Sequence, residues 1–164
     1  PPDETAHTVS RNGAAVAAAV GPDAVVLLDC LRNASAVART VLAEQARRGA
    51  RTSVNVIAAG ELAGAGADAE LRFAVEDHLG AGAVFGALEA LGLDHSSPEA
   101  AAASESFRGL RAAARHLLTA SGSGQELIGR GSRDEVLAAA VHDADDATPV
   151  LRDGIWSAWT HTRA

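Results

Sequence analysis

The chain has 164 residues, 48% of them hydrophobic and 21% charged, a balance typical of one soluble globular domain. Its formal net charge is −7 and only 3% of its residues are aromatic, so it lacks the basic surface and the stacking side chains with which proteins bind nucleic acids. No uncharged apolar stretch reaches the length of a membrane span, so we expect no membrane partner either.

Two further features of the composition concern ligands and location. All 14 positions that hold lysine or arginine hold arginine, whose guanidinium group suits paired contacts with phosphate or sulfonate oxygens. Cys30 is the only cysteine, which excludes an internal disulfide and favours a reducing compartment. We therefore expect a cytoplasmic protein, and homo-oligomerisation stays open at this point.

The first half of the chain predicts alternating helices and strands. An alanine-rich helix over 14–20 stops at a Gly-Pro pair, and the apolar run 24–29 predicts a buried strand. A helix with apolar residues at helical spacing then begins at Asn33, a good N-cap, and ends before Gly49, a natural C-cap. A second strand with β-branched character is predicted over 52–59.

The second half predicts more helix than strand. A loose segment precedes a long helix over 71–91, and Ser97-Pro98 predicts the start of a third helix that reaches Thr119. The patterns Ser123-x-x-Glu126 and Ser132-x-x-Glu135 each predict a short capped helix, and 148–151 predicts a last strand. The alternation predicts one α/β domain over 1–164, a three-layer α/β/α arrangement with a mixed or mostly parallel sheet. Only three strands are visible in the sequence, so part of the sheet is expected to be missing.

Packing is expected to rest on few large residues, because alanine dominates the apolar count. The predicted large core residues are Phe73, Phe85, Phe107, Trp156 and Trp159. Glycines 82 and 86 in the long helix are predicted to permit close packing with another helix. The six histidines show no metal-binding spacing, and the glycines at 60, 64 and 66 have the wrong spacing for a dinucleotide loop.

The turn from Asp29 to Ser35 is the first candidate for ligand binding. It places Arg32, Asn33 and Ser35 after a strand and at the start of a helix, where free backbone N–H groups and the helix dipole attract anions. Helix capping alone is the favoured alternative for Asn33 and Ser35. Asn12 and Gly13 form an earlier turn that offers a similar contact, although a plain turn explains them as well.

Carboxylates provide the second candidate site. Glu76 and Asp77 lie in an apolar helical stretch, where a buried carboxylate needs a partner such as an arginine, backbone N–H groups or a metal. Their oxygens suit Mg²⁺, which takes a few carboxylates together with water and phosphate oxygens. Favourable interaction with the helix dipole is an equally good explanation of the pair. Glu61 follows a predicted strand and Gly60, a position where a ligand is expected, although a simple loop residue is slightly favoured.

Several segments together resemble the 2-phosphosulfolactate phosphatase family, the ComB-like enzymes of coenzyme M biosynthesis. The specific matches are Asn-Ala-Ser-Ala-Val-Ala over 33–38 and Val-Glu-Asp over 75–77. Weaker matches are the Asn-Gly turn at 12–13, Ala-Ala-Gly-Glu over 58–61, Ser121-Gly122, Glu126-Leu127, Gly131 and Pro-Val-Leu-x-Asp-Gly over 149–154. The matching order runs from about residue 8 to residue 155.

The resemblance implies a Mg²⁺-dependent phosphatase that acts on 2-phosphosulfolactate or a related phosphorylated hydroxy acid. Asn33 and Ser35 would bind phosphate or sulfonate, Glu76 and Asp77 would hold the metal or position water, and Glu61 would support them. Ala14 departs from the family, which usually has Ser or Thr after the Asn-Gly turn. The family also begins with a further strand-rich section, so the chain is expected to correspond to its later part. A non-catalytic domain that binds oxyanions or a partner is the rival interpretation.

Overall fold

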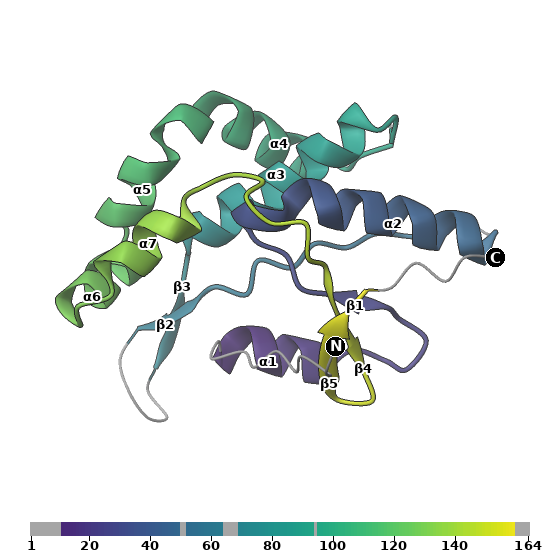
Figure 1. Ribbon diagram of the computed structural model, residues 1–164, viewed down its shortest axis with the longest axis horizontal. Helices are drawn as coiled ribbons and strands as arrows, with labels where there is room; N and C mark the ends of the chain where they lie inside the picture. The colour runs from purple at the N-terminus through teal and green to yellow at the C-terminus, as the bar shows by residue number, and fades with distance from the viewer. Residues whose placement is uncertain (1–10, 50–51, 64–68, 94, 160–164) are drawn as a thin grey trace.

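The computed structural model describes residues 11–49, 52–63, 69–93 and 95–159, and it combines helices with two small sheets (Figure 1). The helices are α1 Arg11–Ala18, α2 Ala34–Arg48, α3 Val75–Ala90, α4 Pro98–Leu110, α5 Ala114–Ala120, α6 Gly122–Gly129 and α7 Arg133–Ala139, with short 3-10 turns η1 Leu31–Asn33 and η3 Arg111–Ala113. The strands are β1 Val26–Leu27, β2 Glu61–Ala63, β3 Glu70–Arg72, β4 Pro149–Arg152 and β5 Ile155–Ala158. The mixed α/β class is therefore confirmed.

The sheets of the described residues differ from the mostly parallel sheet that we predicted. One sheet has the order β1-β4-β5 and the other consists of β2 and β3, and every pairing in both is antiparallel. The described residues do not confirm a three-layer α/β/α arrangement. The first sheet is antiparallel because β1 pairs with β4, near the C-terminal end of the described chain. In this pair residue 26 lies opposite residue 151.

The predicted strand over 52–59 has no assigned strand pairing. Its Val54 and Val56 pack against the core, while Asn55 and Ile57 are exposed, so the alternation of a strand is present. The next two strands, β2 and β3, make a hairpin within the segment that was predicted to be a loose stretch followed by a helix. Glu61 lies opposite Arg72 in this hairpin, a cross-strand pair of opposite charges. Residues 64–68 lie outside the described residues.

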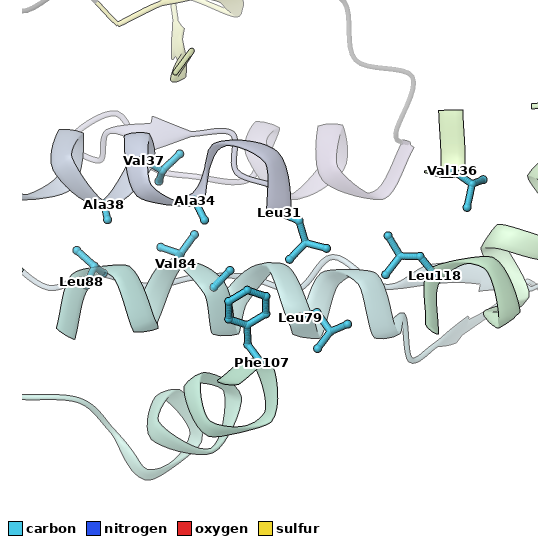
Figure 2. Close-up of a cluster of buried hydrophobic side chains, with 11 residues drawn as sticks. Leu31, Ala34, Val37, Ala38, Leu79, Val84, Leu88, Phe107, Leu118 and Val136 are labelled. Carbon is cyan, nitrogen blue, oxygen red and sulfur yellow. The ribbon is translucent and has the colours of Figure 1, made fainter. Parts of the chain in front are cut away.

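The core lies between α2 and α3. Leu31, Ala34, Val37 and Ala38 face Leu79, Val84 and Leu88, and Phe107 of α4 packs on the other side of α3 (Figure 2). Leu118 of α5 and Val136 of α7 extend the same cluster toward the short helices. Burying these side chains in one cluster supplies most of the favourable free energy of folding.

Close approach of α3 and α4 depends on Gly82. A Cβ atom at this position would lie 2.1 Å from the carbonyl oxygen of Ala103, so α4 reaches α3 only because the side chain is absent. Our prediction for Gly82 is confirmed. At Gly86 the nearest atom to such a Cβ is the Ser104 hydroxyl oxygen at 3.5 Å, an ordinary contact, so this glycine is not required for packing.

Several local predictions are confirmed and several need correction. Ser97 caps α4 by accepting a hydrogen bond from the Ala100 N–H, and Gly49 ends α2 with φ 62°. Asn33 precedes α2 but makes no capping bond, and α6 is capped by Ser121 rather than Ser123.

The predicted large core residues differ in how far they are buried. Phe107 and Trp156 are buried, and Phe85 is partly buried against the core. Phe73 is wrong as a core residue, since 75% of it is exposed; it follows β3 and turns outward before α3 begins. Trp159 is partly buried, with the Arg152 guanidinium 5.5 Å from its ring centroid. No helix in the described part of the chain is long and apolar enough to cross a bilayer.

Candidate active site

The start of α3 carries the predicted carboxylates. Ala74 is the N-cap, and Glu76 and Asp77 occupy the first turn, where the free N–H groups and the helix dipole favour negative charge. The two side chains have different surroundings. Glu76 has a buried carboxylate oxygen, Oε2, with no hydrogen-bond partner among the described residues. Asp77 Oδ2 accepts a hydrogen bond from the Gly60 N–H, with 2.7 Å between nitrogen and oxygen.

The turn at Gly60 joins three predicted site residues to Asp77. Gly60 has φ 71°, a left-handed conformation that glycine adopts without strain. Asn12 of α1 donates a hydrogen bond from Nδ2 to the Gly60 carbonyl oxygen at 2.8 Å. Glu61 follows directly, and its Oε1 accepts a bond from the Leu62 N–H at 3.2 Å. The structure thus brings Asn12, Gly60 and Glu61 to the first turn of α3, and Gly13 lies next to Asn12 on α1.

Negative charge accumulates around Asp77. Burial raises the pKa of Asp77, the bond from Gly60 opposes that rise, and the charges of Glu76 and Glu61 add to it. Such crowding favours either a proton or a bound cation at these carboxylates.

Asp29 is a further carboxylate near Asp77 that the sequence did not single out. Its Oδ2 lies 4.0 Å from the place where a Cβ of Gly80 would be, one turn along α3 from Asp77. Burial raises the pKa of Asp29 to about 6, and the charge of Asp77 contributes to the rise. A carboxylate at the end of an apolar run, directly after β1, was the available signal.

A cleft of about 220 Å³ opens beside Glu76. It is lined by Arg72, Phe73, Val75, Glu76, Ser121, Gly122 and Ser123. Arg72 supplies its positive charge and is held by Glu126, whose Oε1 lies 2.7 Å from Nη2. A Cβ at Gly122 would lie 3.0 Å from Nη1 of Arg72, so glycine lets the guanidinium group lie close to the first turn of α6. Sequence reasoning missed Arg72, because nothing near it indicates that it reaches a carboxylate.

The predicted oxyanion turn has its polar atoms engaged elsewhere. Asn33 accepts a bond from the Cys30 N–H and donates to the carbonyl oxygens of Leu28 and Ala147. These contacts hold η1 and the end of β1 to the loop before β4.

Ser35 and Arg32 bind carboxylates of the chain itself. Ser35 donates to Asp143 from both its N–H and its hydroxyl, at 2.8 Å and 2.6 Å. Arg32 Nε lies 2.6 Å from Asp145 Oδ2, and its Nη1 donates to the Ala138 carbonyl oxygen. The anion at the start of α2 is therefore Asp143. Substrate binding by Arg32, Asn33 and Ser35 stays a prediction.

The carboxylate oxygens of Glu76 and Asp77 at the start of α3 are ligands of the kind that Mg²⁺ prefers. The described residues hold no group of three or more His, Cys, Asp or Glu side chains arranged to bind a metal. Two carboxylates are nevertheless enough for Mg²⁺, which keeps several waters and takes further oxygens from a substrate phosphate. The unpartnered oxygen of Glu76 beside Asp77 fits that pattern.

Comparison with known proteins gives the family of the chain. No curated protein and no solved structure matches the chain. The family model described as 2-phosphosulpholactate phosphatase matches residues 3–154, which is nearly the whole sequence and includes α1, the Gly60 turn and α3. The chain therefore belongs to the 2-phosphosulpholactate phosphatase family.

Proposed function

We propose that the chain is a Mg²⁺-dependent phosphatase that hydrolyses 2-phosphosulfolactate, or a related phosphorylated hydroxy acid, to the free hydroxy acid and phosphate. Membership of the family supports the phosphatase class. The observation that carries the metal and the site is Glu76 Oε2, a buried carboxylate oxygen without a partner in the described part of the chain. It belongs to the residue before Asp77, at the edge of a cleft. Leaving a buried charge unpaired is unfavourable, so a cation at this place has a physical reason.

Each group of the site then has a role. Glu76 and Asp77 hold Mg²⁺, which when bound neutralises phosphate charge and polarises water. In the reaction a water oxygen bonds to phosphorus, the bond from phosphorus to the ester oxygen breaks, and that oxygen takes a proton to become the hydroxyl group. The raised pKa of Asp77 also suits acceptance of a proton from water, so the roles of ligand and base stay open between the two residues. Glu61 supports them with its nearby charge.

We propose that the substrate lies in the cleft beside Glu76. Arg72 is its cation, and the first turn of α6 presents the backbone of Gly122 and Ser123 to the same space. A substrate with an acid group in addition to its phosphate gains from both, since guanidinium and helix N-termini each bind oxyanions. A compact phosphorylated hydroxy acid has that chemistry.

The test is phosphate release from 2-phosphosulfolactate with the purified chain. We expect turnover with Mg²⁺, none with EDTA, and a loss of about 100-fold or more in Glu76→Gln. Glu70→Gln is the matched control, because Glu70 is an exposed glutamate on β3, and it should keep full activity. Binding of the substrate without hydrolysis, unaffected by Glu76→Gln, would support the rival non-catalytic domain and end the proposal.

A further inference from the structure

Two hydrogen bonds connect α1 to the carboxylate of Asp77. Asn12 donates from Nδ2 to the Gly60 carbonyl oxygen at 2.8 Å, and the Gly60 N–H donates to Asp77 Oδ2 at 2.7 Å. The three residues are separated by 48 and 17 positions in the sequence, so the contacts depend on the tertiary fold. Gly60 is the common member, with its carbonyl turned to α1 and its N–H turned to α3.

The conformation of Gly60 makes this arrangement specific. Its φ of 71° belongs to the left-handed region, and a Cβ would lie 2.9 Å from Leu71 Cδ1 and 3.1 Å from the Arg72 carbonyl oxygen. Glycine is therefore required on both conformational and steric grounds. A glycine has no side chain to hold its own peptide groups in place, and the bond from Asn12 supplies that restraint.

Asp77 has a particular need for a fixed donor. It is partly buried and has the charges of Glu76 and Glu61 nearby, so its carboxylate depends on a hydrogen-bond donor held in place. The Gly60 N–H is a donor of this kind. By binding Oδ2, it also restrains rotation of the carboxylate.

We propose that Asn12 is a positioning residue for the reaction: through Gly60 it sets the orientation of the Asp77 carboxylate, without touching the substrate. This inference rests on the proposed function, since it assumes that Asp77 serves Mg²⁺ or water. It assigns the Asn-Gly turn at the start of α1 a role different from the substrate contact expected from the sequence.

The experiment compares Asn12→Ala with the unchanged chain by two measurements. In the first, the Gly60 amide is followed by ¹H–¹⁵N NMR, without metal and during titration with MgCl₂. In the second, phosphate release is measured over a range of Mg²⁺ concentrations. We expect the Gly60 amide resonance to move upfield in Asn12→Ala, and the Mg²⁺ concentration for half-saturation to rise about tenfold in both measurements, which corresponds to the loss of one hydrogen bond. Turnover at saturating Mg²⁺ should stay within about threefold of the unchanged chain.

Controls separate positioning from simple stability. Asn55→Ala removes an exposed asparagine near the same turn and should change neither readout. Asn12→Ser keeps a shorter donor, so its Gly60 amide shift and its half-saturating Mg²⁺ concentration should lie between those of the unchanged chain and of Asn12→Ala. It replaces Asn12→Ala if that variant does not fold. The inference would be overturned if the Gly60 amide resonance did not move in Asn12→Ala and the half-saturating Mg²⁺ concentration stayed within twofold of that of the unchanged chain.

Failure of the proposed function has a different signature. Asp77→Asn should abolish the effect of Mg²⁺ on the Gly60 amide. If Mg²⁺ shifts that amide equally in the unchanged chain and in Asp77→Asn, the metal site is wrong. An upfield shift of the Gly60 resonance in Asn12→Ala would still show that Asn12 holds the turn.

Discussion

Asp29 is a residue whose ionisation opposes folding, and this gives a pH-dependent prediction. Burial, with the charge of Asp77, raises its pKa from 3.8 to about 6. The folded chain therefore holds the proton to a higher pH than the unfolded chain, and stability falls as the pH rises from about 4 to about 6. Asp29→Asn should raise the free energy of unfolding by about 1–2 kcal/mol at pH 7 and by almost nothing at pH 3.5. Urea unfolding in EDTA at the two pH values measures this.

The control for Asp29 is Asp23→Asn, because Asp23 is exposed on the turn before β1. It should leave the free energy of unfolding unchanged at both pH values. An equal gain for Asp29→Asn at pH 3.5 and pH 7 would mean that its ionisation is not responsible.

At the scale of residues, the carboxylates of α3 are easier to recognise in the sequence than the partners of the predicted oxyanion turn. Glu76 and Asp77 stand out because they are charged in an apolar helical stretch, and that contrast is visible in one dimension. Whether Asn33 or Ser35 has free donors depends on Asp143 and Ala147, more than a hundred positions away. No local pattern specifies such partners. Arg72 was missed for the same reason, since its partner Glu126 lies 54 positions away, whereas Asp29 had a local signal at the end of an apolar run.

Among the elements, the crossing of α3 and α4 gives the sharpest prediction. Gly82→Ala places a Cβ 2.1 Å from the Ala103 carbonyl oxygen and 2.8 Å from Phe107 Cβ, so α4 must move. We expect a loss of about 2–4 kcal/mol in the free energy of unfolding, the size of an overpacked core contact or more. Gly86→Ala is the matched control on the same helix. It should be neutral or stabilising by about 0.5–1 kcal/mol, because alanine favours helix and the nearest atom is 3.5 Å away. Thermal and urea unfolding of both variants check the difference, and equal effects would contradict the steric argument.

Helices were predicted more accurately than strands, and the reason is physical. The signals for α2 and α4 lie within the helix itself: apolar spacing, Ser97-Pro98 at one start and Gly49 at one end. A strand is stabilised by its neighbour, and β1 finds its neighbour in β4 at the far end of the described chain. The stretch over 52–59 has the composition of a strand and alternating burial over 52–57, yet it has no assigned partner strand. Composition predicts extended chain, and pairing depends on the rest of the fold.

For the whole molecule, the acidic loop that precedes β4 joins the C-terminal hairpin to the start of α2. Asp143 accepts two bonds from Ser35, Asp145 pairs with Arg32, and Asp146 pairs with Arg39. Each aspartate by itself is an ordinary surface residue, so the sequence does not single out this loop. Together they neutralise the basic side and the N-terminus of α2, so the chain carries its own anion where a bound oxyanion was expected.

Removing that anion should create the oxyanion site that the sequence suggested. Asp143 has φ 50°, so Asp143→Gly keeps the backbone conformation and leaves the Ser35 N–H and hydroxyl without their acceptor. We expect a loss of about 1–2 kcal/mol in the free energy of unfolding, part of which sulfate should restore by binding at the start of α2. Sulfate stabilises folded proteins in general, so its effect must be compared with chloride at equal ionic strength and with a control variant. Asp146→Gly is that control, because its bond to Arg39 lies away from the Ser35 donors. A sulfate effect of the same size in both variants would show that the N-terminus of α2 does not bind free anions, and would leave Glu76, Asp77 and Arg72 as the groups that meet the substrate.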